Sequence, residues 1–569
     1  MRAQRYVDAD LRTNRTIRIR GIGRLLFGAV RMLGAVRRLE PAVGLALLAV
    51  LIGVFVQSLF YPGFLEDHPF YWAADGEMRK LSTVRGMQLE FGDQHEYAYP
   101  TQWHTDAARV AENEKVGSRN WAGYGVGVLR FGGPGHRQEM CLGYSRASLH
   151  NAHDALSLSC WVDGVPMMRK GGYAAGSLNV PIQWERPEFQ ALKQMDYPHP
   201  IEEAGGGWSG WAREWVRSPM CQNTATVEEV ATGGGWGDNR GFGEVITFKG
   251  GEAGGEPGSG LQVLDVVDHY SWSRVDKDVS DYRRTVIGVE GPDGRPYALD
   301  VLKIEGGQRH QLYQSIWGER AEDSLPAVAS RAENLAEVLF GSTLPEDTWD
   351  YRNYRHMRNV EILDEPGETW ELTWKTDIAA YAPRPVDGSA FQRPLPDDVG
   401  RVRLRSIGIA QPQGKPQLLR AKAPYIGIIT QPLPNNQRLH GNVSIVDGRD
   451  MMMEHRVSAD PEAQLDSLYV HILEGYREGE QPAIVEVSQP AFESTGGTER
   501  DVICLRLSMA GGHTDTLVYQ AEPGEIRTAD GLETDARYAV GIGIGHVRTV
   551  CARYDVANHA HQVLHIHLA

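Results

Sequence analysis

From Trp121 to its end, the chain consists of short runs of β-branched and aromatic residues, and this pattern limits the possible folds more than any other feature. The runs are bounded by Gly, Pro or Asp, and several alternate between apolar and polar residues with a period of two, as strands with one buried face do. We therefore expect a mainly β protein of antiparallel, stacked β-sandwich units. One helical insert is expected at Ser324–Phe340, where apolar residues recur at helical spacing.

The composition agrees with a folded chain made largely of strands and turns. The 569 residues include 64 Gly, 30 Pro, 14 Trp and 22 Tyr, and turn-forming and aromatic residues favour many short strands over long helices. A charged fraction of 23% and a hydrophobic fraction of 41% exclude a disordered chain, a coiled coil and a polytopic membrane protein.

An uncharged segment, Pro41–Leu65, follows a basic tail. Residues 1–38 contain ten Arg, no Lys and two Asp, although the whole chain has a net charge of -16. About 20 apolar residues cross the hydrocarbon core of a bilayer as a helix, and flanking positive charge stays on the cytoplasmic side. We therefore expect a basic cytoplasmic tail over 1–38 and a single transmembrane signal anchor over 39–65, with a cleaved signal peptide as the competing interpretation.

Beyond the anchor, the chain is expected to be periplasmic or extracellular. We expect a poorly patterned linker over 66–120, a first β-sandwich domain over 121–440 and a second β-sandwich unit over 441–569. This part of the chain is acidic, which argues against nucleic acid as a partner, because nucleic-acid binding needs a basic face.

Five Cys lie in the same part of the chain, at wide spacing and without a CxxC motif, so neither a zinc ribbon nor a redox motif is indicated. Cys141 and Cys160 fall in neighbouring strand-like runs. They could form a disulfide in an oxidising compartment, or they could remain buried free thiols.

The most informative segment is His150–Tyr173, HNAHDALSLSCWVDGVPMMRKGGY. It is followed by SPMCQNTATVEE at 218–229, by a segment at 281–318 that contains DYRRTV and EGGQRH, and by SLYVHILEGY from residue 467. In this order the segments resemble the β-sandwich region of the heparinase II/III-like polysaccharide lyases, over roughly residues 121–569. The matching positions are Asp154, Gly164, Tyr173, Asn223, Thr224, Arg283, Arg284, Asp300, Gly306, Gly307 and His310. The resemblance implies an acidic, uronic-acid polysaccharide as partner.

Some members of this family have a metal site in the same region, and this chain departs from its pattern. The three ligand positions are occupied by Ala152, Arg169 and Gln222. Ala and Arg cannot bind a divalent cation, and Gln is a poor ligand compared with imidazole. We therefore expect no metal and no other cofactor there. Four histidines near the C-terminus would share one face of a straight strand, but we do not expect them to form a metal site either: His559, His561, His565 and His567.

The chain also lacks some of the groups that the elimination reaction implied by the resemblance would need. This reaction needs a group that neutralises the uronate, a base and an acid. In the family some of these groups come from an N-terminal α/α toroid of several hundred residues, and the linker over 66–120 is far too short to contain one. Only His150 matches a histidine associated with the family's active site, so it is the one catalytic candidate, and whether this chain is an enzyme stays open.

Other polar and aromatic residues are candidates for binding the polysaccharide, because arginine binds carboxylates in a bidentate manner and aromatic rings stack on sugars. Structural roles are the alternative: Arg283 and Arg284, on alternate faces of a strand, would satisfy an acidic neighbour and solvent, respectively, and Asn223 would hold a loop. The candidates are Arg169, Lys170, Trp211, Arg213, Arg217, Asn223, Arg283 and Arg284.

The sequence thus favours a membrane-anchored protein that acts on or binds acidic polysaccharide and is catalytically impaired as a lone chain. A separate protein could supply the toroid. The alternative is a glycan-binding or structural pseudoenzyme of the cell envelope without lyase activity.

Overall fold

The computed structural model describes most of the chain from Gly117 onward. The described residues are 117–121, 125–133, 136–144, 155–163, 165–168, 201–203, 215, 218–230, 243–250, 261–268, 272, 278–291, 293–315, 318–341, 353–376, 401–411, 415–432, 438–495, 501–522, 524–528, 532–534, 536–542, 546–550, 553–555 and 560–562. Among them no helix is long and apolar enough to span a membrane. The expected tail and anchor over 1–65 lie outside these residues, as does nearly all of the linker.

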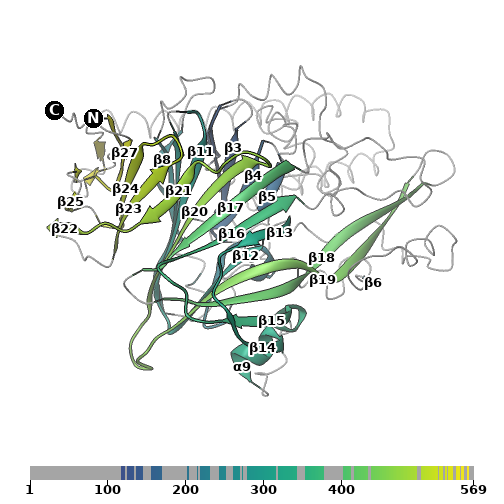
Figure 1. Ribbon diagram of the computed structural model, residues 1–569. Coiled ribbons are helices and arrows are strands. Elements are labelled where there is room, and N and C mark those ends of the chain that lie inside the picture. Colours follow the sequence, from purple (N-terminus) through teal and green to yellow (C-terminus); the bar gives the residue numbers. More distant parts are fainter. Residues whose placement is uncertain are drawn as a thin grey trace, which may run out of the picture.

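The described chain is mainly β, and its strands pair antiparallel in six sheets. An eight-stranded sheet, which we call the central sheet, lies in the middle (Figure 1). Its strands, in spatial order, are β13 (Gly318–Asp323), β16 (Thr369–Thr376), β17 (Val402–Ile409), β20 (Asp466–Arg477), β11 (Pro296–Gly306), β10 (Val279–Glu290), β9 (Leu261–Val267) and β8 (Glu244–Lys249).

Two sheets share one face of the central sheet. The N-terminal sheet has the order β1 (Arg119–Trp121), β2 (Val126–Phe131), β3 (Gln138–Gly143), β4 (Ser157–Val162) and β5 (Val165–Met168). The hairpin sheet has the order β14 (Val328–Asn334), β15 (Arg358–Leu363), β18 (Gln417–Pro432), β19 (Arg438–Val457), β12 (Arg309–Ser315) and β7 (Ala225–Val227). Its strands β18 and β19 continue outward as a long hairpin, and β6 (Ile201–Glu203) pairs with β19 (Figure 1).

The C-terminal sheet covers the other face of the central sheet. Its order is β21 (Ile484–Ser488), β23 (Val502–Met509), β24 (Thr514–Gln520), β27 (Tyr538–Ile542) and β28 (His546–Val550). A three-stranded sheet packs on its outer side through Phe492 and Ile526, and consists of β22 (Phe492–Thr495), β25 (Glu525–Thr528) and β26 (Glu533–Thr534). The last two strands, β29 (Arg553–Asp555) and β30 (Ala560–Gln562), pair with each other.

The central sheet is buried on both faces because alternate residues of its strands enter two different cores. In β11, Leu302 and Ile304 pack under the N-terminal and hairpin sheets, whereas Leu299 and Val301 pack against the C-terminal sheet. Close packing leaves no room for a side chain at Gly408 in β17, where a Cβ atom would lie 2.1 Å from the ring of Trp370.

A third core covers the outer face of the hairpin sheet. It includes Tyr313, Leu419 and Met453 of the sheet, and residues of three short helical elements that pack on them. These elements are η3 (Pro219–Cys221), α9 (Leu335–Phe340) and η4 (Asn353–His356).

The helix expected over Ser324–Phe340 forms only in its last third. Residues Val328–Asn334 pair with β15 as the edge strand β14, and only α9 is helical. The side chain of Asn334 accepts a hydrogen bond from the backbone amide of Glu337 and caps the helix. Cross-strand pairing therefore overrides the helical spacing of the first two thirds.

The boundary expected between residues 440 and 441 falls inside β19. Strand β20, expected in the second unit, pairs with β11 on one side and β17 on the other, in the middle of the first unit's sheet. The C-terminal sheet begins only at Ile484. Sequence patterns show where strands begin and end, but not which distant strand each one pairs with.

Cys141 and Cys160 are buried free thiols. They lie on the paired strands β3 and β4, but Cys141 is opposite Ser159 and Cys160 is opposite Met140. An offset of one residue places the two side chains on opposite faces of the sheet. The disulfide alternative is therefore wrong for this pair.

Candidate functional site

The segments that carry the sequence motif meet where β10 faces the starts of β4 and β7. Two alternate residues of β10 reach this place. The hydroxyl group of Tyr282 lies 2.8 Å from Thr224 Oγ1. Arg284 Nη1 donates to the carbonyl of Leu156 at 2.8 Å and also to the carbonyl of Asn223. We call these residues, together with Asp300, the motif frame.

Arg284 is the centre of the motif frame. Its Nε and Nη2 donate to the two carboxylate oxygens of Asp300 at 2.8 Å and 2.7 Å, and neither side chain is more than 2% exposed. A bidentate pair of this kind orients the guanidinium rigidly. The expectation that Arg284 faces solvent is therefore wrong, and a role in binding substrate carboxylates is not supported, because the group is used to join three segments of the chain.

Arg283 points to the opposite face of β10, towards the C-terminal sheet. Its Nε donates to Asp265 at 2.7 Å and its Nη1 to the carbonyl of Ala521 at 3.2 Å; the hydroxyl of Tyr538 also donates to Asp265. Burial alone would raise the pKa of Asp265, but Arg283 beside it lowers that pKa below its usual value. The expected acidic neighbour of Arg283 is confirmed, and the pair is structural because it is buried between two sheets.

Asn223 holds a loop. Its backbone is left-handed with φ 52, a conformation that Asn adopts more readily than most residues. Its side-chain Nδ2 donates to the carbonyl of Leu158 at 3.0 Å, and the residue is fully buried. The structural alternative is thus confirmed, and Asn223 presents no exposed group to a polysaccharide.

The family's metal does not fit here. The one described residue of its three positions is Gln222, which is buried and whose Nε2 donates to Cys221 Sγ at 3.5 Å. A side-chain amide beside a thiol is a poor substitute for the imidazole of the family pattern.

The Gly-Gly-x-x-His segment forms a buried turn. Gly306 and Gly307 have φ of 107 and 74, and a Cβ at Gly306 would lie 1.9 Å from the carbonyl oxygen of Asp278. His310 Nε2 donates to the Gly306 carbonyl at 2.6 Å, so its Nδ1 is left to accept from Ser467 Oγ at 2.8 Å. Burial lowers the pKa of His310 to about 4. The motif glycines and histidine are therefore structural.

The remaining candidates stay predictions, because they lie outside the described residues: His150, Arg169, Lys170, Trp211, Arg213 and Arg217. The side chains of the four C-terminal histidines are likewise outside the description. The motif frame nevertheless holds Ala155 and Leu156, which directly follow the segment His150–Asp154: the Ala155 carbonyl accepts from Thr224 Oγ1 and the Leu156 carbonyl from Arg284.

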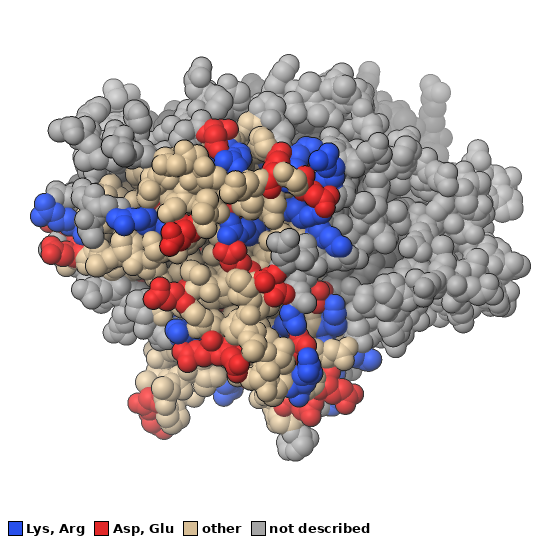
Figure 2. Space-filling model, viewed as in Figure 1, with Lys and Arg blue, Asp and Glu red and all other residues tan. Residues whose placement is uncertain are grey.

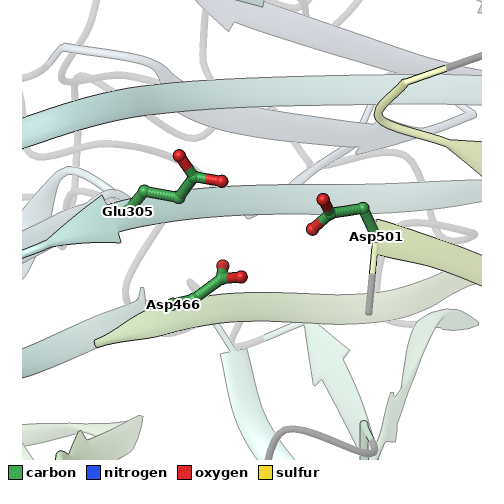
Figure 3. Close-up of side chains that lie close together, drawn as sticks. All are labelled: Glu305, Asp466 and Asp501. Atoms are coloured by element: carbon green, nitrogen blue, oxygen red, sulfur yellow. The ribbon is translucent and has the colours of Figure 1, made fainter. Parts of the chain in front are cut away.

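A second cluster of charged residues was not expected from the sequence. Carboxylate oxygens of Glu305, Asp466 and Asp501 lie within 4.8 Å of one another, on β11, at the start of β20 and just before β23 (Figure 3). Among the described residues it is the one acidic group with spacing suited to a metal. Lys303 Nζ, however, lies 2.6 Å from Glu305 Oε1 and 3.4 Å from Asp501 Oδ1.

Lys303 thus supplies a cation to this cluster. Burial alone would lower its pKa, but hydrogen bonding to Glu305 and the charges of Asp281 and Asp501 raise it above its usual value. The ammonium group therefore stays protonated and compensates part of the negative charge. Lys303 and Glu305 are two residues apart on one strand face, so a sequence pattern could have suggested that pair; Asp466 and Asp501 come from distant parts of the chain.

No family model and no curated protein matches the sequence. Among solved structures, the chain is similar to a heparan sulfate lyase from Pedobacter heparinus, with a TM-score of 0.36 and 11% identity over 72% of this chain and 44% of that one. It is also similar to a heparinase III gene product with methylated lysines, with a TM-score of 0.39 and 12% identity over 80% of this chain and 53% of that one. A putative mutarotase from Salmonella typhimurium has a TM-score of 0.27 and 9% identity over 63% of this chain and 93% of that one. The chain spans about half the length of the two lyases.

Proposed function

We propose that this chain binds acidic, uronic-acid polysaccharide on the outer side of a membrane and does not cleave it on its own. One observation carries the proposal: three residues that the family pattern selects, Asn223, Arg284 and Asp300, form one hydrogen-bonded unit with the backbone of Leu156. Leu156, Asn223, Arg284 and Asp300 are joined through a single guanidinium group. This unit holds Ala155 and Leu156, which follow the segment that contains His150 in sequence, next to β7 and β10.

The described tyrosine and histidine of the motif segments favour binding over catalysis. A general base or acid must reach the substrate with a proton to take or give. Tyr282 is fully buried, its hydroxyl is engaged with Thr224, and burial raises its pKa to about 12. His310 is equally buried and has both ring nitrogens hydrogen-bonded. Neither of these two residues is placed to take part in elimination, and His150 stays the catalytic candidate that the sequence predicts.

The surface charge supports a glycan partner over a purely structural role. Figure 2 shows Lys and Arg side chains interspersed with Asp and Glu over the described part of one face, although the chain has a net charge of -16. Such a surface offers arginines to carboxylates or sulfates, whereas a uniformly acidic surface would repel a polyanion.

The membrane anchor over 39–65 and a separate α/α-toroid protein belong to the same proposal. The uncharged segment after a basic tail supports the anchor. The toroid would supply an acid and a base, so that cleavage would require both proteins.

The test uses the full-length protein, purified in mild detergent, and a panel of heparan, alginate and hyaluronan. We expect retarded migration in affinity gels that contain one of these polymers, and no unsaturated uronate product by ultraviolet absorbance. Product that disappears in His150→Ala would show that the chain is a lyase by itself. Absence of both binding and product would favour the structural envelope subunit.

A further inference from the structure

Two exposed arginines flank a histidine at the junction of η4 and β15. Arg355 is the third residue of η4 and Arg358 the first of β15; both are exposed, and His356 between them is half-buried. Within the part of the chain that the structure describes, neither arginine forms an ion pair, whereas the nearby Arg331 and Arg420 both bind Glu361. The one carboxylate of β15 is therefore already occupied by other cations.

The cross-strand neighbours of Arg358 do not compensate its charge. They are Asn334 on β14 and Lys422 on β18. The side chain of Asn334 is used to cap α9, and Lys422 has a positive charge of its own, which pairs with Asp450 at 2.8 Å. Like charges directly opposite one another destabilise a sheet, so an anion bound between them would relieve a repulsion.

The backbone is irregular at the same point. Strand β15 contains a bulge relative to β18 between Arg358 and Glu361, and Asn359 has a left-handed φ of 52. Bulges redirect side chains out of the regular alternation of a strand and are common next to binding sites. Arg358 therefore lies at the irregular start of β15, two residues after η4.

The positive charges of both arginines act on the pKa of His356. Its ring packs edge-on against Trp215, with ring centroids 6.5 Å apart. Burial, and to a smaller extent the charges of Arg358 and Arg355, lower its pKa to about 4. At neutral pH the imidazole between the two arginines is therefore uncharged.

We propose that Arg355 and Arg358, on either side of His356, form a binding site for the sulfate or carboxylate groups of an acidic polysaccharide. The proposal rests on the function proposed above and gives it a location, on the outer face of the hairpin sheet. Guanidinium groups bind both kinds of anion through paired N–H donors. Trp215, which contacts His356, also ends the sequence WAREW, whose Trp211 and Arg213 are predicted to bind the polysaccharide.

The test compares two variants of the full-length protein in titrations with heparin fragments. The site variant is Arg355→Gln with Arg358→Gln. The matched control is Arg331→Gln with Lys415→Gln, which also removes two exposed positive charges, each of which is paired with a carboxylate. We expect the site variant to bind about tenfold or more weakly than the wild type, since it loses charged hydrogen bonds. The control should stay within about twofold.

A second measurement separates binding from folding. In protein with labelled histidine, saturation with heparin fragments should raise the pKa of His356 above about 4, because the bound anions offset Arg355 and Arg358. The unfolding midpoint of the site variant should equal that of the wild type, since both side chains are exposed.

The outcomes distinguish this site from the proposed function. Equal binding of heparin by the wild type and the site variant would overturn the site and leave the function in place. No binding of any polysaccharide by the wild type would overturn both. Inorganic sulfate that binds as tightly as the fragments, or a polynucleotide whose binding falls equally in the site variant, would overturn the assignment to a polysaccharide.

Discussion

Arg283, Arg284 and Arg405 each bind a carboxylate on a neighbouring strand and a backbone carbonyl in a different part of the fold. For Arg405, the carboxylate belongs to Glu371 and the carbonyl, at 2.6 Å, to Ile484 of the C-terminal sheet. The planar guanidinium suits this use, because its donors point in fixed, separate directions. At the residue scale, then, arginine serves to connect layers.

For Arg284, substitution by Met should lower the free energy of unfolding by about 3–5 kcal/mol, because the Asp300 carboxylate would remain buried without its partner. In the double variant Arg284→Met with Asp300→Leu no charge is left unpaired, and a smaller loss is expected. Urea unfolding at pH 7 measures both. Equal losses would show that the unpaired carboxylate is not what destabilises the single variant.

His310 should make the protein less stable in acid. Its pKa falls from 6.5 to about 4 on folding because of burial, so below pH 6.5 the unfolded chain binds a proton that the folded one does not. The free energy of unfolding contributed by this group is complete above pH 6.5, decreases by about 1.4 kcal/mol per pH unit below it and is lost as the pH falls through about 4.

Urea unfolding between pH 7 and pH 4.5 tests this dependence. His310→Gln should be less stable at pH 7 but should have a shallower dependence on pH. His356 and His455, whose pKa values burial also lowers to about 4, keep the remaining dependence. An unchanged slope in His310→Gln would contradict the assignment to His310.

At the element scale, the packing of β17 against Trp370 of β16 depends on Gly408. Gly408→Ala should lower the free energy of unfolding by about 1–3 kcal/mol, because the new methyl group would overlap the buried ring of Trp370, 2.1 Å away. Gly541→Ala in β27 is the matched control, since its nearest neighbours lie 3.9 Å away. Thermal unfolding of both variants checks the difference, and a loss of similar size in both would refute it.

Strand positions could be predicted from the sequence more readily than their partners. The run of aliphatic residues in LQVLDVV predicts β9 correctly, because a strand buried on both faces is apolar along most of its length. The same pattern cannot show that β20 enters between β11 and β17, since pairing depends on residues more than 150 positions apart. The helix predicted from the apolar spacing before Leu335 was wrong for a related reason: Val328–Asn334 forms a strand because it pairs with β15.

The candidate site was predictable to a similar degree. The ordered motif selects Asn223, Arg284 and Asp300, and these residues do lie together. It does not show that they are buried, because an arginine in a strand looks the same in sequence whether it faces solvent or a carboxylate. Arg355 and Arg358 were missed, since what distinguishes them is that neither forms an ion pair with a described carboxylate; the strand neighbours of Arg358 are Asn334 and Lys422.

At the scale of the whole molecule, the central sheet needs both of its covering layers. The face under the C-terminal sheet has Leu299, Val301, Ile407, Val470 and Ile472 buried in one core. A chain shortened to end at Glu480 would leave this face in water, and exposed apolar surface of that size leads to aggregation. We expect the shortened protein to be insoluble or aggregated in size-exclusion chromatography, unlike the full-length protein. A soluble, cooperatively unfolding fragment would contradict the layered arrangement.

The place of β20 also has a consequence for how the chain folds. Strands β8 to β11 are complete once residue 306 has been made, but their sheet stays open at β11 until residues 466–477 arrive. Contacts this distant in sequence slow folding, and an open strand edge can pair with the wrong chain in the meantime. We therefore expect slow refolding from denaturant and a need for a chaperone that protects the edge of β11 while the chain is synthesised.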